Sequence, residues 1–341
     1  MKLAVIGGGY WGVNLIRVFH QLGVLGGICD FNPERVRRLS AEYPDVPTDL
    51  TYETILADSS IDAVVIATPA ETHYALAKQA LLGGKDVFVE KPMTLRADET
   101  AELAELANRH RRILMVGHLL EYHPAVTRLR ELIEEGYLGR IEYIYSNRLN
   151  LGKVRREENA LWSFAPHDIS VILLLLKELP IQVTATGGTY LQPNIADVTV
   201  STMLFSRGAR AHLFVSWLHP YKEQKLVVVG ERRMAVFDDV RKADKLQLYD
   251  KRIELLNGQF VAERPTPQTI ELPPEEPLSL ECRHFVECVE TRRTPKTDGM
   301  DAWRVLKVME ASQRSLSMNG EPVQLERVRP GGRDSYADAN V

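Results

Sequence analysis

The chain has 341 residues, of which 45% are hydrophobic and 26% are charged, and its formal net charge is −4. This composition is ordinary for a globular protein, and the length predicts two domains, because domains usually hold about 100–200 residues. The slightly acidic balance argues against a nucleic-acid binder, which needs a basic face to neutralise phosphates.

Three cysteines are too few for a disulfide framework, so we expect a reducing compartment. The chain passes from Met-Lys directly into a strand pattern without the features of a signal peptide. No apolar run approaches the roughly 20 residues that span a bilayer. We therefore predict a cytoplasmic protein without a membrane partner. Cys282, His284 and Cys288 lie close together, but they fall in an ordinary helical stretch without a fourth ligand, so we predict no metal.

The first 118 residues alternate between strand and helix patterns, which predicts a parallel sheet with crossover helices. In chain order, the expected strands are residues 3–6, 24–29, 63–67, 87–89 and 113–116, and the expected helices are residues 11–22, 33–43, 71–82 and 96–110.

The second half contains consecutive strand patterns, which predict a large and mostly antiparallel sheet. The expected strands are residues 141–150, 183–187, 197–205, 211–217, 225–229, 234–238 and 246–249. The expected helices are residues 124–135, 165–176, 280–291 and 300–316, and the proline-rich residues 265–277 are expected to form a surface loop.

A glycine motif, G-x-G-x-x-G, follows the first expected strand and opens the first expected helix. In that position Gly7 permits a tight turn, Gly9 lets the backbone approach a pyrophosphate, and Gly12 lets the helix pack on the strand. The free N–H groups of the helix then face the phosphates. The motif, with Tyr10 and Trp11 inside it, predicts a dinucleotide site on a Rossmann domain over residues 1–120.

Asp30 ends the second expected strand, about 20 residues after the glycines, where a carboxylate accepts hydrogen bonds from the adenosine ribose. A carboxylate there repels a 2′-phosphate, so we predict NAD rather than NADP. Arg35, Arg37 and Arg38 follow, and we interpret them as solvated helix residues rather than phosphate ligands.

Glu90-Lys91-Pro92 follows the strand at residues 87–89, so Lys91 lies at the carboxyl end of a parallel strand, where open α/β sheets bind ligands. A lysine there can also be a surface cation without a role. Because Lys91 accompanies a nucleotide-binding motif, we favour a catalytic role for it.

These motifs together resemble the glucose-fructose oxidoreductase and inositol dehydrogenase family. Besides the glycine motif, Asp30 and Glu90-Lys91-Pro92, the matching residues are Ala67-Thr68-Pro69 with His73, and Gly117-His118 followed by His123-Pro124. The resemblance implies that Thr68, Pro69, His73, Glu90 and Lys91 contact NAD. It also implies a second α/β domain over residues 121–328, which binds substrate and whose open sheet makes a homodimer or homotetramer. The polar residues 329–341 are expected to be a disordered tail.

The stretch Leu161–Ser170 resembles the family's later motif. His167 matches the family's histidine, whereas Ser163 stands where the family usually has an aspartate. Its Pro166-to-Ser170 version looks like the subgroup that oxidises the 3-hydroxyl of UDP-N-acetylglucosamine or of its uronic acid. Oxidation of an alcohol needs a base and a cation for the developing alkoxide, and Lys91 and His167 are the two candidates. Histidine, which titrates near ~6.5, is the better base near neutral pH.

Basic and amide side chains precede His167, and these types suit a pyrophosphate, hydroxyls and an acetamide. The predicted substrate-binding residues are Glu121, Tyr122, Arg148, Asn150, Lys153, Arg155, Asn159, Ser163 and His167.

The resemblance thus implies NAD-dependent oxidation of UDP-N-acetylglucosamine to the 3-keto sugar. A pathway aminotransferase would then make the 3-amino sugar of lipid A or surface polysaccharide. The alternatives are oxidation of the uronic acid, a free sugar or inositol dehydrogenase, and a non-catalytic NAD-bound regulator.

Overall fold

The computed structural model describes residues 1–48, 51–263 and 265–325, and the chain forms two compact units. The first unit consists of Met1–His123 and Glu275–Leu306. The second consists of Pro124–Pro274 and the described residues from Lys307 onward. Residues 329–341, for which we predict a disordered tail, lie outside the described residues.

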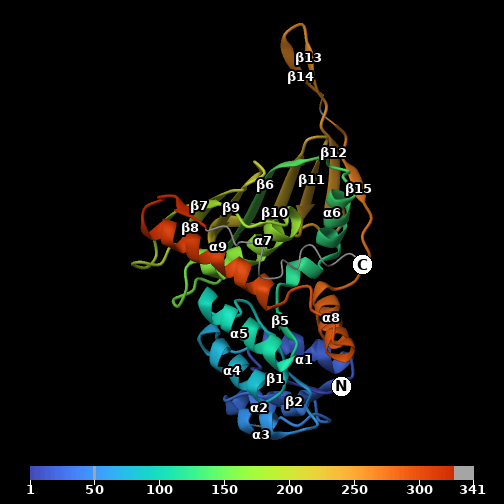
Figure 1. Ribbon diagram of the computed structural model, residues 1–341, viewed down its shortest axis with the longest axis vertical. Coiled ribbons are helices and arrows are strands. Elements are labelled where there is room, and N and C mark those ends of the chain that lie inside the picture. The colour runs from blue at the N-terminus through green and yellow to red at the C-terminus, as the bar shows by residue number, and fades with distance from the viewer. Residues whose placement is uncertain (49–50, 264, 326–341) are drawn as a thin grey trace. The chain divides into compact units, whose positions relative to one another are not determined.

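The first unit is built on a five-stranded parallel sheet in the order β2-β1-β3-β4-β5. Its strands are β1 (Leu3–Ile6), β2 (Leu25–Cys29), β3 (Ala63–Ile66), β4 (Asp86–Val89) and β5 (Leu114–Val116). Its helices are α1 (Gly12–Gln21), α2 (Pro33–Glu42), α3 (Tyr52–Ala57), α4 (Ala70–Leu82), α5 (Ala97–His110) and α8 (Pro277–Thr291), all labelled in Figure 1, and the 3-10 helix η1 (Leu119–Tyr122).

Helices cover both faces of this sheet. Successive strand residues point to opposite sides, so neighbouring residues of one strand contact helices on different faces. Phe88 joins an apolar cluster with α1, α2 and α8, whereas Val87 and Val89 join a second cluster with α3, α4 and α5. The predicted doubly wound Rossmann architecture is therefore confirmed. The short helix α3 was not predicted, because its six residues are too few to show a helical repeat of apolar positions.

One segment expected in the second domain belongs to the first unit instead. Within Glu275–Leu306, helix α8 buries Leu278, Cys282 and Phe285 against α1 and β4. Its apolar spacing predicts a helix but not the sheet on which that helix packs. Helix α9 (Gly299–Ser317) spans the boundary between the two units.

The second unit contains a nine-stranded sheet in the order β15-β12-β11-β10-β6-β9-β8-β7-β16. All neighbouring pairs in it are antiparallel except β6 with β9, which confirms the predicted mostly antiparallel sheet. The strands are β6 (Ile141–Leu151), β7 (Gln182–Gly188), β8 (Val198–Leu204), β9 (Arg210–Ser216), β10 (Leu218–Gly230), β11 (Arg233–Asp238), β12 (Leu246–Asp250), β15 (Gln268–Ile270) and β16 (Val323–Gln324). This unit also contains helices α6 (Pro124–Glu134) and α7 (Ala160–Leu176) and the part of α9 from Lys307 onward.

Three elements of this unit differ from the expected ones. Strand β10 begins at Leu218, because the polar residues before Lys225 pair with β6 although they lack an apolar alternation. Strand β15 lies within the expected surface loop. Helix α7 begins five residues before Ala165 because the Asn159 side chain caps it, so Pro166 lies inside the helix and not at its first turn.

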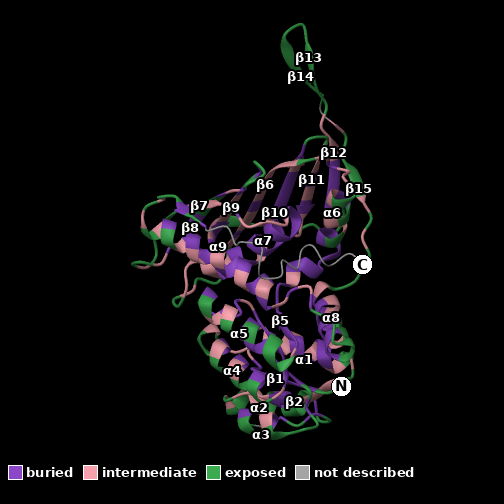
Figure 2. Cartoon of the chain, viewed as in Figure 1, coloured by how far each residue is buried: buried purple, intermediate pink, exposed green. Residues whose placement is uncertain are grey.

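A two-stranded hairpin, β13 (Ile253–Leu256) with β14 (Gln259–Ala262), extends away from the large sheet. All eight of its strand residues are exposed, as Figure 2 shows. Over the described residues, no helix is both long and apolar enough to cross a membrane.

Candidate functional site

The loop between β1 and α1 has the shape that a dinucleotide's pyrophosphate requires. Gly7 has φ +102°, and a Cβ there would lie 2.7 Å from the Ala67 carbonyl oxygen. A Cβ at Gly12 would overlap the Gly7 carbonyl oxygen, whereas a Cβ at Gly9 would have only the Arg35 guanidinium within 4 Å, at 3.8 Å. The backbone is thus packed tightly behind the loop and left open in front of it, so the loop fits the phosphates of NAD.

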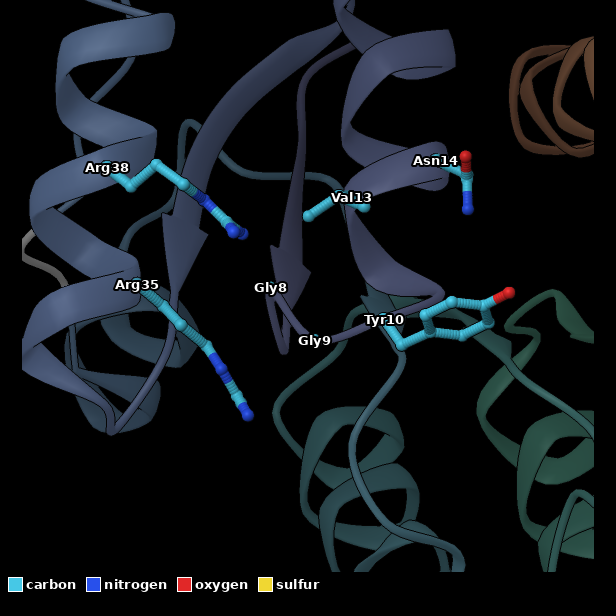
Figure 3. A pocket seen from close by; sticks show the side chains of 7 residues that line it. All are labelled: Gly8, Gly9, Tyr10, Val13, Asn14, Arg35 and Arg38. Carbon is cyan, nitrogen blue, oxygen red and sulfur yellow. The ribbon is translucent and has the colours of Figure 1, made fainter. Parts of the chain in front are cut away.

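A cavity of about 460 Å³ lies in front of this loop. Figure 3 shows Arg35 and Arg38 reaching from α2 toward Gly8 and Gly9, with Tyr10 on the other side. Arg35 and Arg38 therefore line the cavity, and both remain accessible to solvent, as expected of solvated helix residues. The aromatic side chain of Tyr10 is 89% exposed beside the cavity, so it is accessible to a bound nucleotide.

Asp30 lies at the end of β2, as predicted, and its carboxylate is held by the backbone. Oδ2 accepts from the Gly8 N–H at 2.7 Å and Oδ1 accepts from the Asn32 N–H at 2.8 Å. Its side chain is only 1% exposed, and the Arg35 guanidinium lies 3.5 Å away. Asp30 thus fixes the glycine loop and places a negative charge beside Arg35, which lines the cavity.

We expect NAD to bind more tightly than NADP, and Asp30→Ala to narrow that difference by about tenfold or more. The substitution removes the charge that repels a 2′-phosphate and leaves Arg35 and Arg38 in place. The measurement is the dissociation constant of each nucleotide. Arg37→Ala is the matched control, because Arg37 bonds to the Pro33 carbonyl and does not line the cavity. Equal affinity of the unmutated protein for both nucleotides would contradict the assignment.

Glu90 and Lys91 follow β4 directly, at the carboxyl edge of the parallel sheet. The buried Glu90 carboxylate accepts from the Trp11 indole N–H at 2.6 Å and from the Lys91 backbone N–H at 3.2 Å. Gly117 makes room for this carboxylate, because a Cβ there would lie 3.1 Å from both oxygens. Lys91 is partly exposed, and the Lys91–Pro92 peptide bond is cis. The glycine loop and the predicted catalytic lysine are therefore linked through Glu90.

His73 is buried below the loops that follow β3 and β4 and does not face the cavity. Its Nδ1 lies 2.8 Å from the Pro92 carbonyl oxygen, and its Nε2 lies 2.8 Å from the Thr68 carbonyl oxygen. Burial lowers the pKa of His73, so a neutral ring donates to one of the two carbonyls at a time near neutral pH. His73 therefore positions the two loops, while Thr68 and the exposed Pro69 lie at the start of α4.

Glu121 and Tyr122, which we predicted to bind substrate, are buried in the first unit. The Tyr122 hydroxyl lies 2.9 Å from the Thr297 hydroxyl, and burial raises the pKa of Tyr122 well above its usual value. The Glu121 backbone carbonyl accepts from the Lys296 ammonium. Both residues lie on η1, packed beneath α8, because the apolar ring of Tyr122 belongs to the core.

His118, beside η1, takes part in a small buried polar cluster. Its Nδ1 bonds to the Asp301 carboxylate at 2.7 Å and lies 3.8 Å from the Glu121 carboxylate. Ligand-type atoms of these three residues lie within 4.8 Å of one another. Because the imidazole already bonds to Asp301, we assign no ion to the cluster.

The cysteines of α8 lie in an apolar setting. Cys282 is fully buried, and the Cys288 sulfur lies 3.4 Å from His284 Nε2. Burial raises the pKa of both thiols, which disfavours the thiolate that binds metals.

In the second unit, α7 carries His167 and Ser163. The two residues are four apart, so they share one face of the helix. His167 is partly exposed, whereas Ser163 is buried. The neighbouring Asp168 points to the sheet, where it accepts from the Ser146 hydroxyl at 2.6 Å and from the Arg148 Nε at 2.6 Å.

The predicted substrate residues around His167 divide into those bonded within the unit and those accessible to solvent. Arg148 pairs with Asp168, and Asn159 uses its side chain to cap α7 and to donate to Gln313 at 2.8 Å. Both are therefore engaged within the unit. Lys153 is exposed, and the Arg155 side chain is 37% exposed, with the Glu158 carboxylate 3.8 Å from its Nε. Asn150 is partly exposed as a residue, but its Oδ1 is buried and has no hydrogen-bond partner among the described residues.

Together, the doubly wound sheet and its glycine cradle define a dinucleotide-binding domain. Residues 1–118 match the sequence pattern of the oxidoreductase family with an NAD-binding Rossmann fold, and residues 126–236 match the GFO/IDH/MocA C-terminal domain. The chain belongs to the GFO/IDH/MocA oxidoreductase family and binds NAD, as the resemblance implied.

The similarity to individual relatives extends over most of the chain. UDP-N-acetylglucosamine 3-dehydrogenase of Acidithiobacillus ferrooxidans is 27% identical over 90% of this chain and 94% of its own length. A solved structure of that enzyme has a TM-score of 0.83 and 26% identity, and covers 93% of this chain and 98% of its own. Inositol 2-dehydrogenase of Rhizobium meliloti is 25% identical over 78% of this chain and 82% of its own length.

Proposed function

We propose that this protein is an NAD-dependent dehydrogenase that oxidises the 3-hydroxyl of UDP-N-acetylglucosamine to the 3-keto sugar. The observation that carries the proposal is the linked pair Glu90 and Lys91, tied by Trp11 to a loop that fits NAD. The choice of substrate is supported by similarity to the Acidithiobacillus enzyme along 90% of the chain.

The roles proposed for the side chains follow from the reaction. Bound NAD supplies the hydride acceptor. His167 removes the proton of the 3-hydroxyl, because imidazole titrates near neutral pH, and the Lys91 ammonium stabilises the developing alkoxide. The reverse assignment, with Lys91 as the base, needs a lysine of lowered pKa. The buried Asn150 Oδ1, which has no hydrogen-bond partner among the described residues, suits an N–H or O–H donor of the sugar.

Exposed cations of the second unit are proposed to bind the pyrophosphate. Lys153 and Arg155 suit this role because both are accessible, whereas Arg148 is neutralised by Asp168. By resemblance, the keto product would be consumed by an aminotransferase that makes a 3-amino sugar.

We further propose a homodimer or homotetramer, formed through the face of the large sheet opposite α7. On β6, Ser146 and Arg148 contact Asp168 of α7, so Tyr143 and Tyr145 point to the other face. There Tyr145 stacks on His212 of β9, with ring centroids 5.4 Å apart. A partly exposed aromatic face of this kind is typical of protein interfaces.

A substrate panel tests the proposed activity. We expect nicotinamide reduction with NAD and UDP-N-acetylglucosamine, and none with free N-acetylglucosamine or inositol. Reduction only with the uronic acid of UDP-N-acetylglucosamine would identify that uronic acid as the substrate instead. Reduction only with free sugars or inositol, or with no sugar, would contradict the proposal.

A further inference from the structure

Two loops of the second unit leave the large sheet at the same end. Strands β6, β9, β8 and β7 lie side by side in that order (Figure 1). The last residue of β7 pairs with the first residue of β8, and that residue pairs with the last residue of β9. The last residue of β9 pairs with Leu149, near the end of β6. Residues 152–159, which follow β6, and residues 189–197, which join β7 to β8, therefore start from one end of the sheet.

Hydrogen bonds join these two loops. The Gln192 side-chain amide donates to the Arg155 backbone carbonyl. The Ala160 N–H, at the first turn of α7, donates to the Ala196 carbonyl at 2.9 Å. Lys153 and Arg155, which we propose to bind the pyrophosphate, belong to the first loop. The second loop therefore lies beside the proposed phosphate ligands.

The second loop is fixed from within the unit by Asp197, which is fully buried. Its Oδ2 accepts from the backbone N–H groups of Tyr190 and Leu191, at 2.6 and 2.9 Å. Its Oδ1 accepts from the Trp217 indole N–H at 2.6 Å. Hydrogen bonds to a charged acceptor are stronger than those between neutral groups, so the carboxylate holds the backbone at Tyr190 in place.

This fixed backbone presents an aromatic ring to solvent. Tyr190 is 72% exposed, so most of its surface is accessible to a ligand. A Cβ at Gly188 would lie 2.5 Å from the Tyr190 Oη and 2.7 Å from two carbons of its ring. The phenol end of the ring therefore rests against the Gly188 backbone, in space that any other side chain would occupy. Contact on this side limits the positions of the ring and leaves the rest of it open.

We propose that Tyr190 binds the nucleobase of a nucleoside diphosphate sugar by stacking, while the cations of the neighbouring loop bind its diphosphate. This inference rests on the proposed function and deepens it, because it names the residue that holds the base. Every base has a π-face that stacks on an aromatic ring, and a ring already held in place loses little entropy when it binds. Tyr190 therefore contributes affinity for the nucleotide rather than a choice among bases.

The spacing of the two loops fits the two parts of such a ligand. A nucleoside diphosphate carries its base and its phosphates on opposite sides of one ribose. An aromatic ring on one loop and cations on the loop bonded to it match these two parts.

Dissociation constants of UDP and of inorganic pyrophosphate, measured by calorimetry without NAD or sugar, test this role. Tyr190→Ala should weaken UDP binding about tenfold, because the base loses its stacking partner. Pyrophosphate binding should not change, because pyrophosphate has no base. Tyr190→Phe should bind UDP as the wild type does, because the aromatic faces remain.

Gly188→Ala tests the position of the ring while the ring stays in the protein. Its methyl group displaces the phenol end of Tyr190, which is the end of a flexible side chain, so the fold should be kept. UDP binding should weaken, and Tyr190→Ala combined with Gly188→Ala should be no worse than Tyr190→Ala alone. Phe260→Ala is the matched control, because it removes an exposed ring from the hairpin of β13 and β14 and should leave UDP binding unchanged.

Unfolding temperatures show that each variant folds, and sedimentation velocity records its oligomeric state. Wild-type UDP affinity in Tyr190→Ala, or an equal loss of UDP and pyrophosphate binding, would overturn the role of Tyr190 and leave the proposed dehydrogenase intact. A changed oligomeric state with unchanged UDP affinity would also overturn it and assign the ring to a contact between copies of the chain. A wild-type protein that does not bind UDP would contradict the proposed substrate and this inference together.

Discussion

Lys91→Ala and His167→Ala are each expected to lower turnover by about 10²–10⁴-fold, with NAD affinity largely kept. Hydride leaves the sugar carbon only as the hydroxyl proton is removed, so a missing base or cation slows the chemical step rather than binding. If the two residues act as one relay, the double variant should be little worse than the poorer single variant. The measurements are kcat and the NAD dissociation constant of each variant.

Matched controls are Lys78→Ala and His110→Ala, which remove the same side-chain types from the surface helices α4 and α5. Both should keep normal turnover. Near-normal turnover in both Lys91→Ala and His167→Ala would mean that the base lies elsewhere. Tyr122 and Asp168 are poor substitutes, because the first is buried with a raised pKa and the second is paired with Arg148.

The second large effect is expected at the glycine loop. Gly12→Ala should lower the free energy of unfolding by about 1–3 kcal/mol and abolish NAD binding, because its Cβ overlaps the backbone of Gly7. Gly9→Ala should leave the ligand-free stability unchanged, since its Cβ has only the Arg35 guanidinium within 4 Å. It should still weaken NAD binding about tenfold or more, because the methyl group stands where the pyrophosphate approaches.

Denaturant unfolding and NAD titration separate these two effects. The Gly9 and Gly12 variants control for each other, because both add one methyl group to the same loop. Wild-type NAD affinity in Gly9→Ala would show that the pyrophosphate does not approach the loop at this residue.

The sequence predicts those parts of the site whose chemistry is local. Gly7, Gly12 and Asp30 have roles set by a turn and by neighbouring backbone groups, so a motif of adjacent residues is sufficient to find them. The roles of polar residues that bond to other residues of the same unit are harder to predict from sequence. Arg148 suits a phosphate by type, yet its partner Asp168 lies 20 residues away in the sequence. Asn159 has the side chain of a sugar ligand and also that of a helix cap.

Long-range packing explains the rest of the differences. The extension of β10 depends on pairing with β6, about 75 residues earlier, which no local pattern shows. Glu281, a fully buried residue of α8, does leave a sequence signal, because it occupies an apolar position in the helical repeat of Leu278, Cys282 and Phe285. A carboxyl group at such a position indicates either a buried acid or a misassigned face, and only the packing of α8 distinguishes them.

The most direct test of the central claim uses UDP-N-acetylglucosamine that carries deuterium at C3. We expect the reduced nicotinamide to carry that deuterium, and the sugar product to have the mass of the unlabelled 3-keto compound. Unlabelled substrate and substrate labelled at C4 serve as controls, and neither should transfer deuterium. Reduced nicotinamide without deuterium from the C3-labelled substrate, or with deuterium from C4, would contradict oxidation at the 3-hydroxyl.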